Sequence, residues 1–194
     1  MNNNIQTILF DLDGTLLNTN ELIIQSFMHT FDHYGLSFTL DEIITFNGPP
    51  LTKTFQKIDK DRAEEMIKTY RQHNLHHHDE LVTAFPHVIE TIQELHENNF
   101  SLGIVTTKMN QSVQKGLSLT GLKPFFKTVI TFDDVKHLKP DPEPVLKAMG
   151  ELDAEPETTL MIGDNSHDIL AGQRAGVQTA GVAWAQRGAE YLEQ

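Results

Sequence analysis

The sequence predicts an α/β protein built on a doubly wound parallel sheet, with an all-helical segment inserted after the first strand. Short apolar runs that do not alternate with polar residues recur along the chain, as expected of strands covered on both faces. Segments with helical spacing separate these runs, which is typical of a sheet with helices on both sides. One long stretch, 17–82, shows helical patterns and no strand-like run.

The first predicted strand is the apolar run Ile8-Leu9-Phe10, which is followed at once by Asp11 and Asp13. Its short length and continuous apolarity favour a central strand over a helix. Four later runs have the same character and complete the predicted sheet: 102–105, 129–130, 160–162 and 179–184.

Three helices are predicted between these strands. An apolar stripe follows Pro86, a residue that suits the first turn of a helix. A further helix ends at Gly176, since glycine commonly terminates helices. The three apolar stripes are Val88, Ile92 and Leu95, then Val145, Leu146 and Met149, then Ile169 and Leu170.

The inserted segment reads as a series of helices. An amphipathic stripe from Leu22 to Tyr34 ends at Gly35, and Thr39 with Glu42 has the spacing of a capping box. Two more helices are predicted within 51–58 and 61–74. We therefore expect a core domain of residues 1–16 and 83–194 and a helical domain of residues 17–82.

The run His76-His77-His78 invites a zinc site, because histidine is a common zinc ligand. Consecutive residues cannot all face one ion on a helix. We therefore expect a hydrated hinge at this point, where the helical domain rejoins the core.

Composition excludes several classes of function. The chain has 194 residues, no cysteine and a formal net charge of −12. The absence of cysteine excludes disulfides and thiol chemistry, and the negative charge argues against nucleic acid or an anionic membrane as partner. The amino-terminal residues lack the pattern of a secretory signal, and no run is long enough to cross a bilayer. We expect a cytoplasmic protein that is a monomer or a weak homodimer.

Polar clusters follow three of the predicted strands. Asp11, Asp13, Gly14 and Thr15 follow the first, Thr106-Thr107-Lys108 follows the second, and Gly163-Asp164-Asn165 with Asp168 follows the fourth. In an open α/β sheet, ligands bind outside the carboxyl ends of the strands. We expect these clusters to meet at one edge, joined by Lys139 from the loop after 129–130.

Several carboxylates in one place require a cation, because like charges at close range raise one another's pKa. A ligand set of oxygen atoms alone indicates Mg²⁺. One of Asp11 and Asp13 is suited to act as nucleophile and the other as proton donor. Gly14 permits close approach of the backbone, while Thr106 and Lys139 can bind an anion. The cluster therefore predicts phosphoryl transfer on a small phosphorylated substrate through an aspartyl-phosphate.

Taken together and in this order, these motifs resemble the four motifs of the haloacid dehalogenase superfamily of phosphatases, whose core is Rossmann-like. The resemblance implies that Asp11 attacks phosphorus and that Asp13 protonates the leaving group. It further implies that Asp11, the Asp13 backbone and Asp164 hold Mg²⁺. Asn165 and Asp168 would support that site, and phosphate would be bound by Gly14, Thr106, Thr107 and Lys139.

The helical segment resembles the cap domain of this superfamily, a lid that closes over the site. Gly48-Pro49-Pro50 either breaks a helix or forms a specificity loop. Lys53 and Arg71 either reach a second phosphate or are ordinary surface charges.

Within the superfamily, the chain resembles bacterial inorganic pyrophosphatases and their phosphoglycolate phosphatase relatives. Asn18 favours the pyrophosphatase branch, since most capped relatives carry Asp there. Alternatives are a phosphoglycolate or other small phosphomonoester phosphatase, a phosphomutase of the β-phosphoglucomutase type and a regulatory binding module. The resemblance also implies a further strand and helix after 189–194, so the sheet is expected to lack an edge strand.

Overall fold

A computed structural model describes residues 5–192 of the chain. The chain divides into two compact units, which we call the sheet unit (residues 1–18 and 83–194) and the helical unit (residues 19–82). Strand β2 (Leu17–Asn18) pairs antiparallel with β3 (Thr83–Ala84). This pairing holds residues 17 and 18 in the sheet unit, so the division falls after Asn18 rather than after Leu16.

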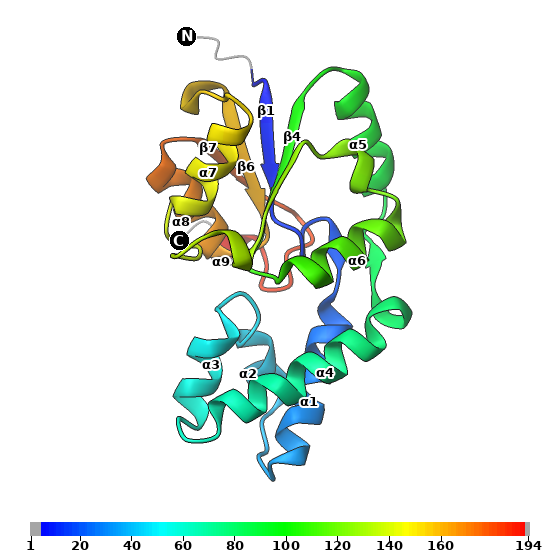
Figure 1. Cartoon of the computed structure of the whole chain (residues 1–194), viewed down its shortest axis with the longest axis vertical. Coiled ribbons are helices and arrows are strands. Elements are labelled where there is room, and N and C mark those ends of the chain that lie inside the picture. The colour runs from blue at the N-terminus through cyan, green and yellow to red at the C-terminus, as the bar shows by residue number, and fades with distance from the viewer. Residues whose placement is uncertain (1–4, 193–194) are drawn as a thin grey trace. The chain divides into compact units, whose positions relative to one another are not determined.

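The sheet unit is organised around five parallel strands in the order β5-β4-β1-β6-β7 (Figure 1). The chain runs outward from β1 to one side, returns to the centre and then builds the other side, which is the doubly wound pattern. All of the predicted strands are present, but the last ends at Gly181 instead of reaching Trp184, whose side chain is 44% exposed. The strands are β1 (Thr7–Phe10), β4 (Ser101–Val105), β5 (Thr128–Ile130), β6 (Thr159–Gly163) and β7 (Gln178–Gly181).

Helices cover both sides of this sheet (Figure 1). On one side, Leu9 and Met161 of the strands pack with Val145 of α7 and Ala171 of α8 in one buried apolar cluster. On the other side lie α5 and α6, the second of which the sequence pattern did not predict. The helices are α5 (Val88–Glu97), α6 (Asn110–Thr120), α7 (Glu143–Glu151), α8 (Ser166–Ala175) and α9 (Ala189–Leu192), with 3₁₀ turns at Lys123–Phe125, Phe132–Asp134 and Pro156–Thr158.

The helical unit contains α1 (Asn20–His33), α2 (Leu40–Thr45), α3 (Leu51–Ile58) and α4 (Ala63–Leu81). Its own apolar core surrounds Phe27, whose ring centroid lies 4.8 Å from that of Tyr70 and 5.6 Å from that of Phe55. The predicted capping box of Thr39 and Glu42 begins α2. None of the helices within residues 5–192 combines the length and the apolar character of a membrane span.

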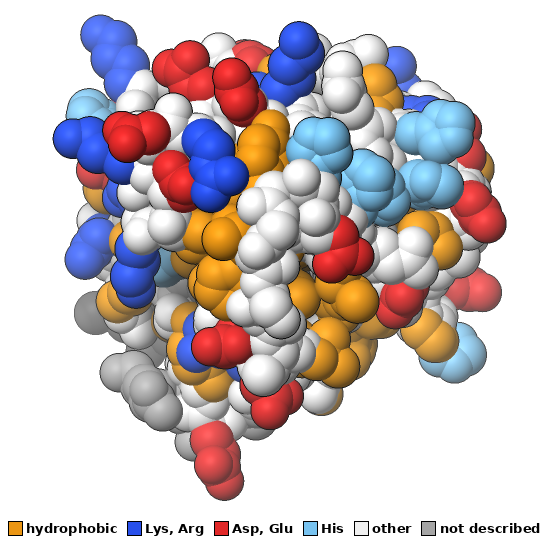
Figure 2. Space-filling view, turned by 90° about the horizontal axis from the view of Figure 1, so that it is seen from below, with side chains coloured by type: hydrophobic (Ala, Val, Ile, Leu, Met, Phe, Trp, Pro, Cys, Tyr) orange, Lys and Arg blue, Asp and Glu red, His pale blue; other side chains and the backbone are white. Residues whose placement is uncertain are grey.

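The histidine run lies inside α4, and the predicted hinge there is wrong. Helical hydrogen bonding continues through it, because the backbone N–H of Val82 still donates to the carbonyl of His78 at 3.0 Å. The side chain of His78 is buried. The ring centroid of His73 lies 4.5 Å from that of His29 and 4.5 Å from that of His77. Figure 2 shows histidine side chains grouped on one surface of the molecule.

Candidate active site

The parallel register brings three strand ends to one edge of the sheet. Phe10 is level with both Ile104 and Ile162, so the residues that follow β1, β4 and β6 emerge together. The backbone N–H of Asp11 donates to the carbonyl of Ile162 at 2.8 Å, and that of Thr106 donates to Ile130 at 2.9 Å. These bonds extend the sheet by one residue and fix where the polar side chains begin.

Lys139 joins these strand ends through its ammonium group. Its Nζ lies 2.7 Å from Asp11 Oδ1, 2.6 Å from Asp168 Oδ1 and 2.7 Å from the carbonyl oxygen of Val105. An ammonium has three hydrogens to donate, so these three acceptors satisfy it completely. Burial alone would lower the pKa of Lys139, but the charges of Asp11 and Asp168 raise it. Lys139 is therefore a buried positive charge held in place by Asp11, Asp168 and the carbonyl of Val105.

Three buried aspartates form a cluster next to this charge. Asp11, Asp164 and Asp168 each offer a carboxylate oxygen, and these oxygens all lie within 4.8 Å of one another. Burial, together with the neighbouring carboxylates, raises the pKa of Asp11 to about 7 and that of Asp164 to about 8, despite the opposing charge of Lys139. The site thus holds more acidic groups than one lysine can neutralise, which is the expected state of a carboxylate site for a cation.

A glycine permits the close approach of the loop after β1 to the side chain of Asp164. Gly14 has φ +83°, and a Cβ atom on it would lie 2.3 Å from Asp164 Oδ2. Both the backbone angle and the space therefore require glycine. The hydroxyl of Thr15 approaches the same carboxylate, with Oγ1 3.4 Å from Asp164 Oδ1.

Helix α8 begins directly after Asp164 and holds Asp168 in place. Asn165 is its N-cap: the side-chain oxygen accepts from the backbone N–H of His167 at 3.2 Å. In return, Asp168 Oδ2 accepts from the backbone N–H of Asn165 at 3.0 Å. This reciprocal capping box leaves Asp168 Oδ1 for Lys139, so the sequence spacing of Asn165 and Asp168 serves both the helix and the site.

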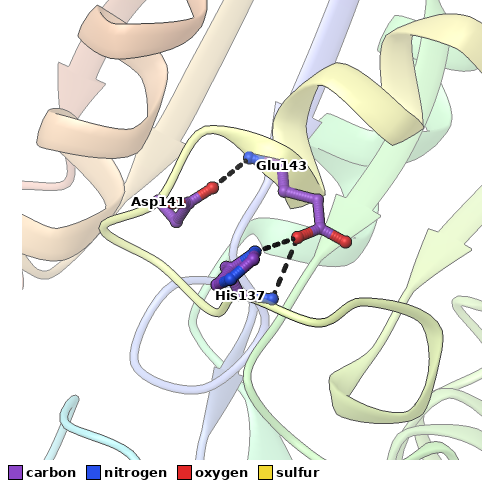
Figure 3. Close-up of side chains that lie close together, drawn as sticks. All are labelled: His137, Asp141 and Glu143. Carbon is purple, nitrogen blue, oxygen red and sulfur yellow. Dashed lines mark hydrogen bonds and ion pairs between the residues drawn. The ribbon is translucent and has the colours of Figure 1, made fainter.

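The loop that carries Lys139 is tied to the start of α7 (Figure 3). The carboxylate of Glu143 accepts from the backbone N–H groups of Lys136 and His137, each at 2.9 Å, and from His137 Nδ1 at 2.8 Å. These bonds, the one from Lys136 first, lower the pKa of Glu143. Asp141 accepts from the backbone N–H of Glu143 at 2.9 Å. The loop therefore closes on itself around Lys139.

Asp13 pairs with a different lysine from that of the buried aspartates. Its Oδ1 accepts from Lys108 Nζ at 2.7 Å, and the two side chains are 19% and 13% exposed. The sequence pattern placed Lys108 in a strand-end cluster without assigning it a role. Thr106 is buried and its Oγ1 accepts from the backbone N–H of Lys108 at 3.2 Å, while Thr107 is half-buried.

The remaining predicted residues lie in the helical unit. Gly48, with φ +101°, and Pro49 form the half-buried turn before α3, and Lys53 is exposed on that helix. Arg71 is exposed on α4. It lines a surface hollow of about 280 Å³ together with Glu64, Ile67, Lys68, Gln72 and Leu75. The role of these residues in specificity stays a prediction.

The sheet unit therefore has the architecture of the open α/β class of enzymes, in which ligands bind outside the carboxyl ends of the parallel strands, where these acidic groups lie. A family model described as haloacid dehalogenase-like hydrolase matches residues 8–182. Because that match covers most of the chain, the protein belongs to this family.

Curated relatives and a solved structure agree with this assignment. The chain is 60% identical over 189 residues to pyrophosphatase PpaX of Oceanobacillus iheyensis, covering 97% of this chain and 88% of the relative. It is 58% identical over 190 residues to pyrophosphatase PpaX of Anoxybacillus flavithermus, with the same coverage of 97% and 88%. A haloacid dehalogenase-like family hydrolase of Streptococcus pneumoniae has a similar structure, with a TM-score of 0.87 at 28% identity over 97% of this chain and 90% of that one.

Proposed function

We propose that the protein is a Mg²⁺-dependent phosphatase that hydrolyses inorganic pyrophosphate through a phosphorylated Asp11. The observation that carries the chemistry is the cluster of Asp11, Asp164 and Asp168, of which Asp11 and Asp168 form ion pairs with Lys139. The choice of pyrophosphate is supported by relatives of 58% and 60% identity that are named pyrophosphatases.

The donor set fits magnesium. The groups that converge offer oxygen atoms from carboxylates, with no histidine or cysteine among the three, and hard cations such as Mg²⁺ prefer such ligands. Asp11, the backbone carbonyl of Asp13 and Asp164 would hold the ion, with Asn165 and Asp168 supporting them. When bound, the ion supplies neutralisation of the carboxylates and polarisation of the phosphoryl oxygens.

The first chemical step is assigned to Asp11. A carboxylate oxygen of Asp11 attacks phosphorus, the bond from phosphorus to the bridging oxygen breaks, and that oxygen leaves with the electron pair. Asp13 donates a proton to the departing oxygen. Lys139 orients Asp11 by its 2.7 Å ion pair, and Thr106 lies at the adjacent strand end to bind the transferred phosphoryl group.

The second step releases the enzyme. Asp13, now a carboxylate, takes a proton from water, and the water oxygen forms a bond to phosphorus as the bond to Asp11 breaks. Phosphate is released and Asp11 regains its free carboxylate.

The decisive test compares Asp11→Asn with the unmodified enzyme. An amide is a poor nucleophile, so we expect kcat for pyrophosphate to fall by at least about 10³-fold while the thermal unfolding transition stays cooperative. Phosphate release should be measured with Mg²⁺ and with a chelator, on pyrophosphate and on phosphoglycolate. Asp32→Asn, on the exposed face of α1, is the matched control.

Two results would contradict the proposal. Phosphate release by Asp11→Asn at the unmodified rate would exclude the covalent mechanism. A higher kcat/KM for phosphoglycolate than for pyrophosphate in the unmodified enzyme would exclude pyrophosphate as the preferred substrate.

A further inference from the structure

Lys108 is a basic residue of the sheet unit that the mechanism above does not use. Its ammonium lies 2.7 Å from Asp13 Oδ1, at the carboxyl edge of the sheet where the substrate is proposed to bind. Part of the side chain reaches solvent, whereas Lys139 is 3% exposed and donates to three acceptors. Lys139 is therefore held by three groups of the protein itself, and Lys108 is the lysine placed to supply a further positive charge to a substrate.

The position of Lys108 also defines which part of the substrate it meets. Asp13 is assigned to protonate the leaving oxygen, so a group in contact with the Asp13 carboxylate lies on the leaving-group side. Asp11, which bonds to phosphorus, is held instead by Lys139, whose Nζ lies 2.7 Å from Asp11 Oδ1. Each lysine thus pairs with a different aspartate: Lys139 with the residue assigned to attack phosphorus, and Lys108 with the residue assigned to protonate the leaving oxygen.

We propose that Lys108 binds the anionic leaving group of the substrate. In the substrate-free site its ammonium neutralises Asp13, and with substrate bound it donates to the departing anion. This inference rests on the proposed phosphatase function. The chemistry it requires is a leaving group with a negative charge of its own, which is a phosphate in pyrophosphate and a carboxylate-bearing glycolate in phosphoglycolate.

The backbone supports this role by fixing the start of the Lys108 side chain. The N–H of Lys108 donates to Thr106 Oγ1 at 3.2 Å, and its carbonyl accepts from the N–H of Phe132 at 2.9 Å. The residue is thus held between the ends of β4 and β5, with only its side chain left to move between Asp13 and a substrate.

The test measures how much kcat/KM falls when the Lys108 ammonium is removed, and how this fall depends on the leaving group of the substrate. Lys108→Met removes the charge and keeps the length of the side chain, whereas Lys108→Arg keeps the charge. Lys127→Met is the control, because Lys127 is exposed and precedes β5, at the end of the sheet opposite to the site. Values of kcat/KM should be measured for pyrophosphate, phosphoglycolate and p-nitrophenyl phosphate. The last has a leaving group that needs little protonation and carries no separate anionic group.

We expect Lys108→Met to lower kcat/KM for pyrophosphate by roughly 10- to 100-fold, as for the loss of a hydrogen bond to a charged group, and for p-nitrophenyl phosphate by less than about 3-fold. Lys108→Arg should recover most of the loss. In an Asp11→Asn background, which removes turnover, Lys108→Met should weaken pyrophosphate binding measured by calorimetry by a similar factor.

An equal loss on all three substrates would overturn the inference, because the loss would then not depend on the charge of the leaving group. Unchanged pyrophosphate binding by Lys108→Met in the Asp11→Asn background would also overturn it, because Lys108 would then act only by orienting Asp13. No loss on any of the three substrates would overturn it as well. If the unmodified enzyme hydrolyses phosphoglycolate but not pyrophosphate, the pyrophosphate assignment fails by itself. The inference is then decided on phosphoglycolate: Lys108→Met should lower kcat/KM more for it than for p-nitrophenyl phosphate and should also weaken its binding in the Asp11→Asn background.

Discussion

Burial and neighbouring charges together set the pKa values of Lys139, Asp11 and Asp164. Asp168 is 1% exposed and Lys139 is 3% exposed, so water screens their interaction very little. A buried charge is tolerated only when it is paired and hydrogen-bonded, and one ammonium cannot pair fully with three carboxylates. The pKa values of Asp11 and Asp164 are raised by burial, and because there are more buried carboxylates than the single ammonium can neutralise.

This imbalance predicts how stability depends on pH when no divalent ion is bound. The folded-state pKa of Asp164 is about 8, above the ordinary value of 3.8, so the folded protein binds more protons than the unfolded chain between these values. Stability is then lost as the pH rises through this window. Asp164→Asn removes the effect. We expect the variant to exceed the unmodified protein in Tm, measured in chelator, by an amount that grows from pH 5 to pH 8.5.

Addition of Mg²⁺ at pH 8.5 should raise the Tm of the unmodified protein and have a much smaller effect on Asp164→Asn. A difference in Tm that is the same at pH 5 and pH 8.5 would show that the Asp164 carboxylate does not titrate in this way.

At the scale of elements, the segment between β5 and α7 carries Lys139 to the site and contains no regular strand or helix around that residue. Its shape depends on side chains at the start of α7, where Glu143 accepts from the backbone of residues 136 and 137. The guanidinium of Arg174, on α8, donates to the carbonyl of Pro140 at 2.7 Å from the other side. Two helices therefore determine where the lysine lies.

Glu143→Ala should lower kcat because Lys139 would no longer be held in position. Removal of three hydrogen bonds frees the loop, and displacement of a charged group by about 1 Å commonly costs up to roughly 10²-fold in rate. We expect a fall in kcat of roughly 10-fold or more for Glu143→Ala and no change for Glu97→Ala, an exposed glutamate at the end of α5.

A double-mutant cycle distinguishes an effect of Glu143 on the position of Lys139 from a general loss of structure. In a Lys139→Ala background, Glu143→Ala should have little further effect on kcat, because its influence passes through the lysine. Equal losses of kcat in both backgrounds would refute a positioning role for Glu143.

At the scale of the whole molecule, the two units have separate apolar cores. The cluster around Leu9 in the sheet unit and the cluster around Phe27 in the helical unit share no residue. A unit with its own core can open without the other, because local stability follows the apolar contacts that a region makes.

Phe27→Ala should therefore destabilise one unit selectively. The side chain is 1% exposed, and removal of a buried phenylalanine costs about 3–5 kcal/mol. In hydrogen exchange followed by mass spectrometry, peptides within residues 19–82 should exchange faster, while those of β1, β4 and β6 keep their protection. Met28→Ala, at a position 49% exposed on the same helix, is the control. Equally faster exchange in β4 and β6 would show that the two cores unfold together.

The sequence could predict the strands and the acidic residues because both depend on local pattern. Continuous apolar runs locate β1, β4, β5 and β6, and the rule for parallel sheets then places Asp11, Thr106 and Asp164 at one edge. Patterns failed where local signals were weak or misleading. Helix α6 buries two large apolar side chains, those of Val113 and Leu117, and the histidine run, which suggests a hinge, continues α4.

Local pattern was enough to predict the five strands of the parallel sheet, the helices α5, α7 and α8, and the acidic residues that follow the strands, because these depend on which residue types follow one another along the chain. Only the tertiary structure decided which charges pair: Lys139 with Asp11 and Asp168, and Lys108 with Asp13. These partners are separated by 128 residues in one case and 95 in another, and side chains so far apart meet only through the register of the folded sheet.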